Sequence, residues 1–391
     1  MGPISSGKLK RDEYWDVVRG LGILAIVLGH ICFYGDVKAF VYLFHVPFFF
    51  FISGALYNET KYKDKPFEYF GARLKGTWTD YMICEVILIA LHNTFVRMGI
   101  VPSQEIYSNF DKLYRVIFVS IFQRSEELDG PVWFIPFWIY SAGIFGGLVW
   151  AGNKAAELTG RTFGTRISAA EAASANAGAA ETMPACRYLF IGILCAAAGF
   201  GGWKFVSKHI GYSQRMELSL LLLPITFAGF LLIPLYPKLR KALKNPAVSI
   251  CMILITGCAL RYCNVRKHIY IDLANYELGS SWFYLIFLIG AAFMLALAAL
   301  TEKVRPAARL MAFFGRYSFY IMVFHIVVVK LIDYVYFRSI GPAAAAVLGA
   351  DLMKYPSSFS GQLWIVYTVL GMLLPALFGA AVRKLRAVID R

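Results

Sequence analysis

Long apolar segments, separated by polar and basic stretches, recur along the whole chain of 391 residues. Ten of them approach or exceed the length of about 20 apolar residues that a helix needs to cross a bilayer. The ten predicted spans are Val17–Phe33, Val41–Leu56, Tyr81–Val101, Val132–Trp150, Tyr188–Trp203, Leu218–Leu235, Val248–Tyr262, Trp282–Leu300, Phe313–Val335 and Leu363–Val382. An amphipathic stretch, Leu113–Phe122, predicts a re-entrant or interfacial helix. The pattern therefore predicts an all-α, polytopic integral membrane bundle.

The composition favours the same class of protein. Hydrophobic residues make up 59% of the chain and charged residues only 16%, whereas soluble domains carry about 25% charged residues. The net charge of +15 comes from basic residues between the apolar segments, and no nucleic-acid-binding module accompanies them. We therefore expect membrane lipids, and no nucleic acid, as partners.

The distribution of lysine and arginine predicts the orientation, because such residues are enriched in cytoplasmic loops. If the N-terminus is cytoplasmic, the inner segments carry 22 of these residues and the outer segments with their helix ends carry 14. We therefore predict that both termini are cytoplasmic. The predicted inner segments are the N-terminal tail, 57–80, 151–186, 236–247, 301–312 and the C-terminal tail.

One inner segment, 151–185, is rich in alanine and poor in large apolar residues. This composition predicts a flexible or partly helical cytoplasmic linker without chemistry of its own. No internal repeat accompanies it, so we treat 1–391 as a single membrane domain. The outer loops 264–280 and 337–361 are long enough to roof an outward-facing cavity.

The seven cysteines do not predict a disulfide framework or a metal site. They fall mostly within apolar runs, and no CxxC pair occurs. No other cluster of ligands has the spacing of a metal site. We therefore expect the cysteines to pack in the core and predict no metal.

Two ionisable residues share one face of the first predicted span. Arg19 and His30 lie eleven positions apart, which brings them within ~20° of one direction and about 16 Å apart along a helix. Ionisable groups at membrane depth are costly and usually face a protein interior or a wet cavity. Arg19 is either a structural residue paired with Asp16 or a functional one. His30 is either a satisfied core histidine, a general base or an acyl carrier.

Further polar residues enter later apolar runs. His45 opens the second span after a short turn, so we expect it in the same outer half of the membrane as His30. Ser53-Gly54 predicts a close approach of two helices. His325 lies about midway through the ninth span, with Ser318 seven residues earlier on roughly the same face. His325 is either a second proton-handling or acceptor-positioning group, or a structural hydrogen-bonding residue.

Several segments, in this order along the chain, resemble the membrane acyltransferase-3 family. The resemblance includes its hallmark, a basic residue and a histidine eleven positions apart, and one block resembles a loop of its sugar O-acetylase branch. The segments are 16–30 (DVVRGLGILAIVLGH), 44–54 (FHVPFFFFISG), 130–136 (GPVWFIP), 272–279 (DLANYELG, the O-acetylase block) and 315–325 (GRYSFYIMVFH).

The resemblance implies transfer of an acyl group, usually acetyl, from a coenzyme A thioester to a hydroxyl of a glycan or lipid-linked acceptor. It implies that Arg19 and His30 are essential. Where family members often carry a larger basic cluster before the third span, this chain has only Arg73-Leu-Lys75. Our candidate site residues are His30, Arg19, His45 and His325 for catalysis, Arg19, Arg73 and Lys75 for acetyl-CoA, and Trp133, Ser318 and Asp272 for the acceptor.

The depth of these residues suggests a route for the two substrates. The anionic head of acyl-CoA would stay at the cytoplasmic end near Arg19, and its pantetheine arm would reach His30, where the acceptor arrives from outside. We expect an integral protein of the bacterial inner membrane that modifies a cell-envelope polysaccharide. Two alternatives remain: a secondary transporter, although the sequence shows no inverted repeat, and an acyltransferase for a small metabolite.

Overall fold

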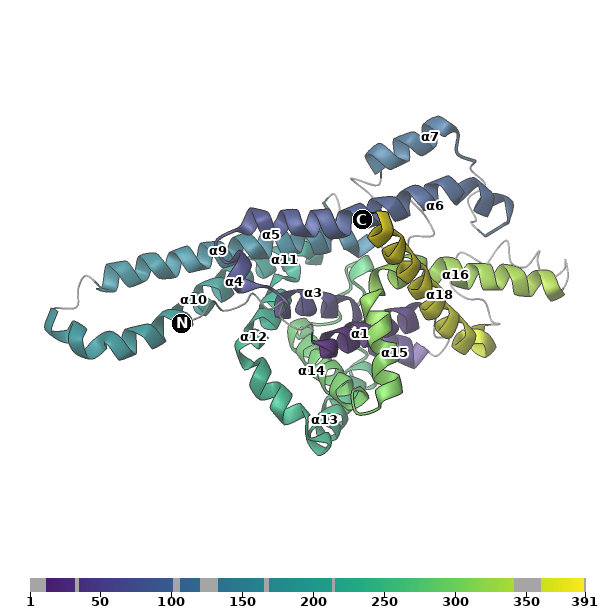
Figure 1. The fold of residues 1–391 in the computed structure, drawn as a ribbon. Helices are drawn as coiled ribbons and strands as arrows, with labels where there is room; N and C mark the ends of the chain where they lie inside the picture. Colours follow the sequence, from purple (N-terminus) through teal and green to yellow (C-terminus); the bar gives the residue numbers. More distant parts are fainter. Residues whose placement is uncertain are drawn as a thin grey trace.

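The computed structural model describes residues 12–31, 35–100, 106–119, 133–164, 169–212, 215–340 and 360–389. Among these residues the fold is helical, and the only strand-like pairing is an isolated bridge between Asp272 and Glu277. Ten helical stretches are long and apolar enough to cross a membrane, and each corresponds to one predicted span. The prediction of an all-α polytopic bundle is confirmed (Figure 1).

The helices vary greatly in length. The longer ones are α1 (Glu13–Ile31), α3 (His45–Ala55), α6 (Thr79–Arg97), α9 (Ile135–Gly164), α10 (Ala169–Ser207), α12 (Leu223–Leu243), α13 (Pro246–Val265), α14 (Phe283–Thr301), α15 (Arg305–Arg316), α16 (Ser318–Ile340) and α18 (Ser360–Ile389). The short ones are α2 (Gly35–Tyr42), α4 (Glu59–Tyr62), α5 (Pro66–Arg73), α7 (Asn109–Tyr114) and α11 (Met216–Leu221), with π-helical segments at Leu74–Trp78 and Arg115–Val119.

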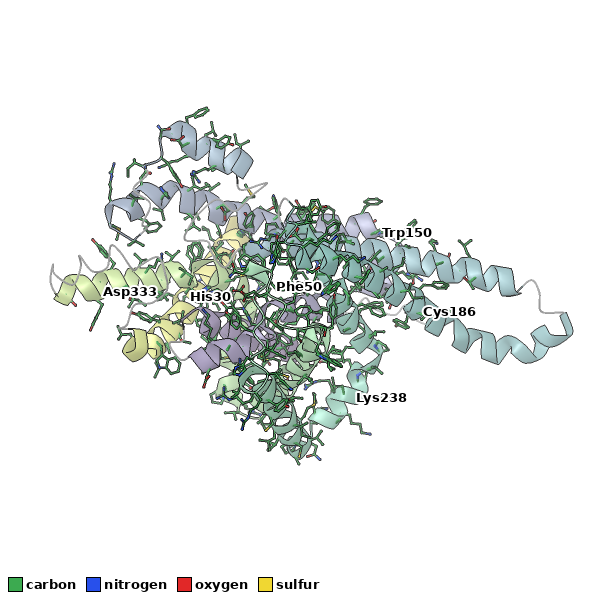
Figure 2. The ribbon with its side chains drawn as sticks, turned by 180° about the vertical axis from the view of Figure 1, so that it is seen from behind. His30, Phe50, Trp150, Cys186, Lys238 and Asp333 are labelled. Carbon is green, nitrogen blue, oxygen red and sulfur yellow. The ribbon has the colours of Figure 1, made fainter. Side chains whose placement is uncertain are left out.

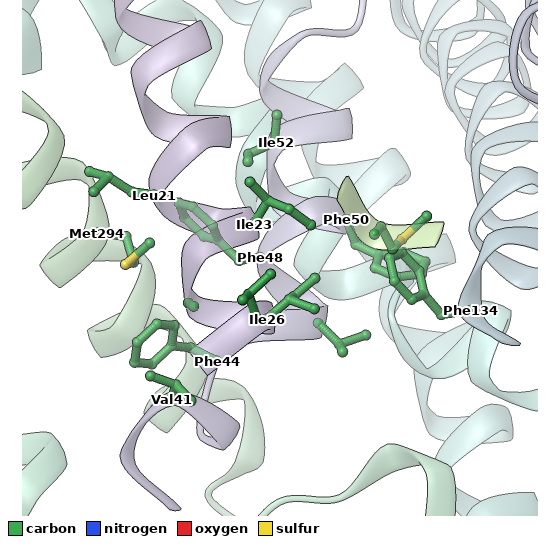
Figure 3. Close-up of a cluster of buried hydrophobic side chains, with 14 of the residues drawn as sticks. Leu21, Ile23, Ile26, Val41, Phe44, Phe48, Phe50, Ile52, Phe134 and Met294 are labelled. Atoms are coloured by element: carbon green, nitrogen blue, oxygen red, sulfur yellow. The ribbon is translucent and has the colours of Figure 1, made fainter. Parts of the chain in front are cut away.

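Helix α1 lies at the centre of the bundle. It contacts α2, α3, α14, α15, α16 and α18, and most of its side chains are buried on every face. A helix that is apolar all round is stable only when it is surrounded by other helices. Figure 3 shows part of this packing, with Leu21, Ile23 and Ile26 of α1 in one cluster with side chains of α3.

Paired glycines let α1 and α15 touch through their backbones. A Cβ atom on Gly315 would overlap the carbonyl oxygen of Asp16, and a Cβ atom on Gly20 would overlap that of Met311. Lipid provides no hydrophobic force between helices, so close packing of small residues is a main source of helix association in membranes. The two glycines therefore set where α15 crosses α1.

A second glycine pair joins α3 to α12. A Cβ atom on Gly54 would overlap the carbonyl oxygen of Thr226, and a Cβ atom on Gly229 would overlap that of Phe51. The close helix approach predicted at Ser53-Gly54 is confirmed.

The second span differs from its prediction at its beginning. It starts at Gly35 rather than Val41, and it is split into α2 and α3. The polar residues of α2, among them Asp36 and Lys38, hide its helical character from a search for apolar runs. Pro47 lies in the first turn of α3, where its missing N–H is tolerated, and this favours a new helix start there.

The third and ninth spans also have other bounds than predicted. Helix runs continuously from Pro66 through a π-helical segment into α6, so Arg73 and Lys75 lie within helical structure and not in a loop before it. In the ninth span, the expected start at Phe313 is wrong because α15 ends at Arg316 and α16 begins at Ser318.

The inner linker is helical wherever it is described. Helix α9 continues to Gly164 and α10 begins at Ala169, which agrees with the partly helical form of the prediction. Alanine has the highest helix propensity, and this explains helix formation without a core. Figure 1 shows α9 and α10 side by side, extending beyond the other helices on one side.

Other predicted segments are only partly described. The amphipathic stretch 113–122 is helical through Val119, and residues 120–122 lie outside the described residues. The outer loop 337–361 begins with the end of α16 and closes with the start of α18, and residues 341–359 lie outside the description.

The polar contacts named below join predicted inner segments to one another and predicted outer segments to one another. On the predicted inner side, Lys154 pairs with Asp64, Arg240 with Glu302 and Arg386 with Asp80, while Tyr236 donates to Asp12. On the predicted outer side, Arg261 pairs with Asp36, and Arg215 donates to the carbonyl of Ala274. Both described chain ends thus lie with the segments predicted to be inner. That this side faces the cytoplasm stays a prediction.

Substitution of Gly54 by alanine tests the backbone contact between α3 and α12. The added methyl group forces the two helices apart, and overpacking of this kind costs about 1–3 kcal/mol. We expect a lower midpoint of thermal unfolding in detergent. Gly201→Ala is the matched control, because nothing lies within 4 Å of a Cβ atom at this helical position. An unchanged midpoint for Gly54→Ala would contradict the packing described.

Candidate functional site

Arg19 lies in the predicted inner half of α1. Its Nη1 atom lies 3.3 Å from Oδ1 of Asp16, a residue that is only 2% exposed. The predicted pairing of these two side chains is therefore present. It orients the guanidinium, because an arginine in an apolar helix needs a partner that compensates its charge.

Arg19 lines a cavity of about 240 Å³ among α1, α3, α9, α16 and the segment that joins α5 to α6. Two other candidates, Arg73 and Ser318, line the same cavity. The structure thus brings together residues from the first, third and ninth spans. The remaining wall also contains Asp80, which pairs with Arg386. The rest of the wall is largely apolar or aromatic and includes Ile23, Phe49, Ile52, Phe134, Trp138 and Met322.

Aromatic rings hold Arg73 in place. Its Cζ atom lies 5.1 Å from the ring centre of Tyr69 and 5.5 Å from that of Trp138. Cation–π contacts of this kind position a guanidinium without neutralising its charge. Lys75, predicted to act with Arg73, is exposed and does not line the cavity.

The three predicted catalytic histidines form one group. The ring centres of His30 and His325 lie 5.5 Å apart, and Tyr42 joins them to His45. The Tyr42 ring lies 6.5 Å from His30 and 4.5 Å from His45, measured between ring centres. Figure 2 shows His30 beside the part of the bundle that α16 and α18 form.

Hydrogen bonds orient two of these rings. Nδ1 of His325 lies 2.9 Å from the carbonyl oxygens of both Ile321 and Met322, and Nδ1 of His45 lies 3.1 Å from that of Val41. Because a carbonyl oxygen only accepts, Nδ1 carries the proton in each ring. In neutral His325 the lone pair is then on Nε2, which is buried and has no hydrogen-bond partner among the described residues.

The cavity ends short of the histidines. Its deep wall contains Ile23 and Met322, and Figure 3 shows Ile23 close to Ile52 between α1 and α3. His30 lies seven positions beyond Ile23, or about 10 Å along the helix, and His325 lies three positions beyond Met322, or about 4.5 Å. Along both α1 and α16, the cavity with the two arginines therefore comes first and the histidine group follows it.

Two predicted acceptor residues lie outside this cavity. Trp133 has the guanidinium of Arg215 over its ring at 5.4 Å. Asp272 accepts hydrogen bonds within its own turn, from the N–H of Ala274 and the side-chain amide of Asn275, each at 3.0 Å. The structure does not bring these two residues to Ser318.

A buried carboxylate ties the outer segments around Trp133 together. Glu217, 1% exposed, accepts from the hydroxyl of Tyr276 at 2.6 Å and from the N–H of Tyr212 at 2.9 Å. Burial, and then the hydrogen bond to Glu217, raise the pKa of Tyr276 to about 12. The phenol therefore stays protonated and remains a donor at neutral pH.

The sequence reasoning missed Tyr42 and Trp138. Tyr42 lies at the start of the predicted second span, where an aromatic residue is usually core or interfacial, so no signal pointed to it. Trp138 lies within an apolar span, where an aromatic residue is usually core or interfacial. Only the fold shows that its ring faces Arg73.

Comparison with known families identifies the N-terminal part of this arrangement. Residues 12–155 match the sequence model of a family described as an acyltransferase domain, Acyl_transf_3. No curated protein and no solved structure matches the chain. The match covers Arg19, His30, His45, Arg73, Lys75 and Trp133, whereas the blocks with Asp272, Ser318 and His325 lie beyond it. Residues 12–155 are thus similar to the acyltransferase-3 domain, and the ten candidate spans among the described residues make the protein an integral membrane acyltransferase.

Proposed function

We propose that this protein transfers an acyl group, in the first instance acetyl, from cytoplasmic acyl-CoA to a hydroxyl of a cell-envelope glycan or lipid-linked saccharide, in a bacterial inner membrane. One observation carries the proposal. The same helix, α1, contributes an arginine to a cavity with a second arginine, and a histidine to a group of three.

Arg19 and Arg73 would bind the phosphates of the donor. Guanidinium groups form paired, charge-assisted hydrogen bonds with phosphate oxygens. The cavity of about 240 Å³ suits the slender pantetheine arm better than the nucleotide head. We therefore place the head at the inner mouth and the arm in the cavity, with the thioester at the Ile23 and Met322 wall.

Acyl transfer needs a proton acceptor next to the attacking hydroxyl. In the base route, an imidazole nitrogen takes the hydroxyl proton while the oxygen attacks the thioester carbonyl carbon. The C–S bond then breaks, and the leaving thiolate takes that proton to give an ester and free coenzyme A. A lone pair on Nε2 of His325, next to His30, supports a base shared between the two rings.

A carrier route uses the same residues. His30 attacks the thioester, coenzyme A leaves as the thiol, and the acceptor hydroxyl then displaces the imidazole. Quenched single-turnover reactions with labelled acyl-CoA and no acceptor separate the routes. Label bound to the wild-type protein but not to His30→Ala identifies the carrier route. Absence of protein-bound label, from an enzyme that is active when acceptor is added, identifies the base route.

Removal of the α1 residues tests the catalytic assignment. In acceptor-dependent release of thiol from acetyl-CoA, we expect His30→Ala to lower the rate about 10²- to 10⁴-fold, the range for loss of an acid–base group. Arg19→Ala should chiefly raise the KM for acetyl-CoA. His92→Ala is the control, because His92 is also buried, 1% exposed, but stacks on Tyr107 away from the site.

Unchanged rates of thiol release in both His30→Ala and Arg19→Ala would overturn the assignment of these two residues to the site. Absence of thiol release under all conditions, together with movement of a solute into proteoliposomes, would favour a transporter instead.

Arg73 and Lys75 give a second, sharper comparison. Loss of a hydrogen bond to a charged group costs about 1.5–3 kcal/mol, so we expect Arg73→Ala to weaken coenzyme A binding by roughly ten- to a hundredfold. Lys75→Ala should change the affinity little, because Lys75 is exposed and outside the cavity lining. Isothermal titration calorimetry in detergent measures both affinities. An equal loss in the two variants would show that the cavity is not the phosphate-binding site.

A further inference from the structure

Ser53, a residue of the cavity wall, has a buried hydroxyl without a partner. The residue is 5% exposed, it lines the cavity, and its Oγ atom has no hydrogen-bond partner among the described residues. A buried hydroxyl without a partner costs stability. An unpaired hydroxyl in the wall of a cavity therefore points to a ligand that completes it.

Trp138 explains why the hydroxyl is unused. A serine within a helix commonly bonds to the carbonyl four residues earlier, which for Ser53 is that of Phe49. This carbonyl accepts instead from the indole Nε1 of Trp138 at 3.4 Å. The same ring lies beneath Arg73, so one tryptophan supports both the cationic group and the available hydroxyl.

The position of Ser53 lies between the two ends of the site. It is eight residues beyond His45 in α3, or about 12 Å toward the inner side. The neighbouring Gly54 packs against the backbone of α12, and this contact holds α3 in position. The cavity wall to which Ser53 belongs includes the apolar residues Ile23, Ile52 and Met322.

We propose that Ser53 is a donor-binding residue, whose hydroxyl forms a hydrogen bond with an amide group of the pantetheine arm. The inference rests on the proposed function. It adds a polar contact between the arginines, which would bind phosphate, and the histidines, which would handle the acyl group, nearer to the level of Arg19. A hydroxyl both donates and accepts, so it matches either the N–H or the C=O of an uncharged amide.

Calorimetry in detergent with two probes tests this assignment. For coenzyme A, we expect Ser53→Ala to weaken binding about three- to tenfold, as loss of one uncharged hydrogen bond does. For adenosine 3′,5′-bisphosphate, which lacks the arm, the affinity should not change. Ser141→Ala is the matched control, because Ser141 is also buried and unpaired at Oγ but does not line the cavity.

Trp138→Phe provides a second variant. It frees the carbonyl of Phe49 to accept from Ser53, so we expect a similar loss of coenzyme A affinity. Because this variant also changes the ring beneath Arg73, its affinity for adenosine 3′,5′-bisphosphate is measured as the control for the arginine and should not change. The double variant with Ser53→Ala should lose no more than Trp138→Phe alone. Thermal unfolding of every variant shows whether the fold is retained.

The outcomes separate this inference from the proposed function. If the wild-type protein binds coenzyme A and Ser53→Ala binds it equally well, the assignment of Ser53 is overturned and the proposed function stands. An equal loss in Ser53→Ala and Ser141→Ala also overturns the assignment. If the wild-type protein binds no coenzyme A, the proposed function fails and the role of Ser53 fails with it.

Discussion

The backbone contact between α1 and α15 is the constraint on which the rest of the site depends. Gly315 meets the carbonyl of Asp16, and Gly20 meets that of Met311. Asp16 is the residue that pairs with Arg19. Because α16 begins only three residues after Gly315, the same contact sets the register of α16 against α1. That register places Ser318 in the cavity with Arg19, and His325 against His30.

This arrangement orders the chemistry by depth. An arginine is tolerated near one end of a buried helix because Asp16 and the cavity compensate its charge. Farther along α1, at the depth of His30, a side chain must be able to lose its charge at little cost. Histidine meets this requirement, because it can be neutral or charged near neutral pH. The positions of Arg19 and His30 thus agree with the electrostatics of a membrane protein as well as with the long donor substrate that we propose.

The sequence predicted what depends on local periodicity. The spacing of Arg19 and His30, the ten apolar spans and the close approach at Gly54 can all be derived from residues near each other in the chain. The split of the second span was missed because α2 begins with polar residues. The extension of the third was missed because Arg73 and Lys75 interrupt an apolar run within a helix. The contacts of His30 with His325, and of Trp138 with Arg73, join residues more than sixty positions apart. Periodicity carries no information about such contacts.

The apolar residues Ile23 and Met322 lie between the cavity and the histidines, where they can exclude water. Water that reached the thioester would compete with the acceptor hydroxyl, and exclusion of water protects reactive groups in many active sites. A cavity lined by two arginines and by none of the histidines would, in the proposed reaction, keep the two substrates on separate approaches. In the proposed reaction the thioester would meet an imidazole only if the arm displaced side chains such as Met322, whose unbranched chain adapts easily. Under the proposed function, filling of the cavity by the correct donor would thus be a condition for the reaction.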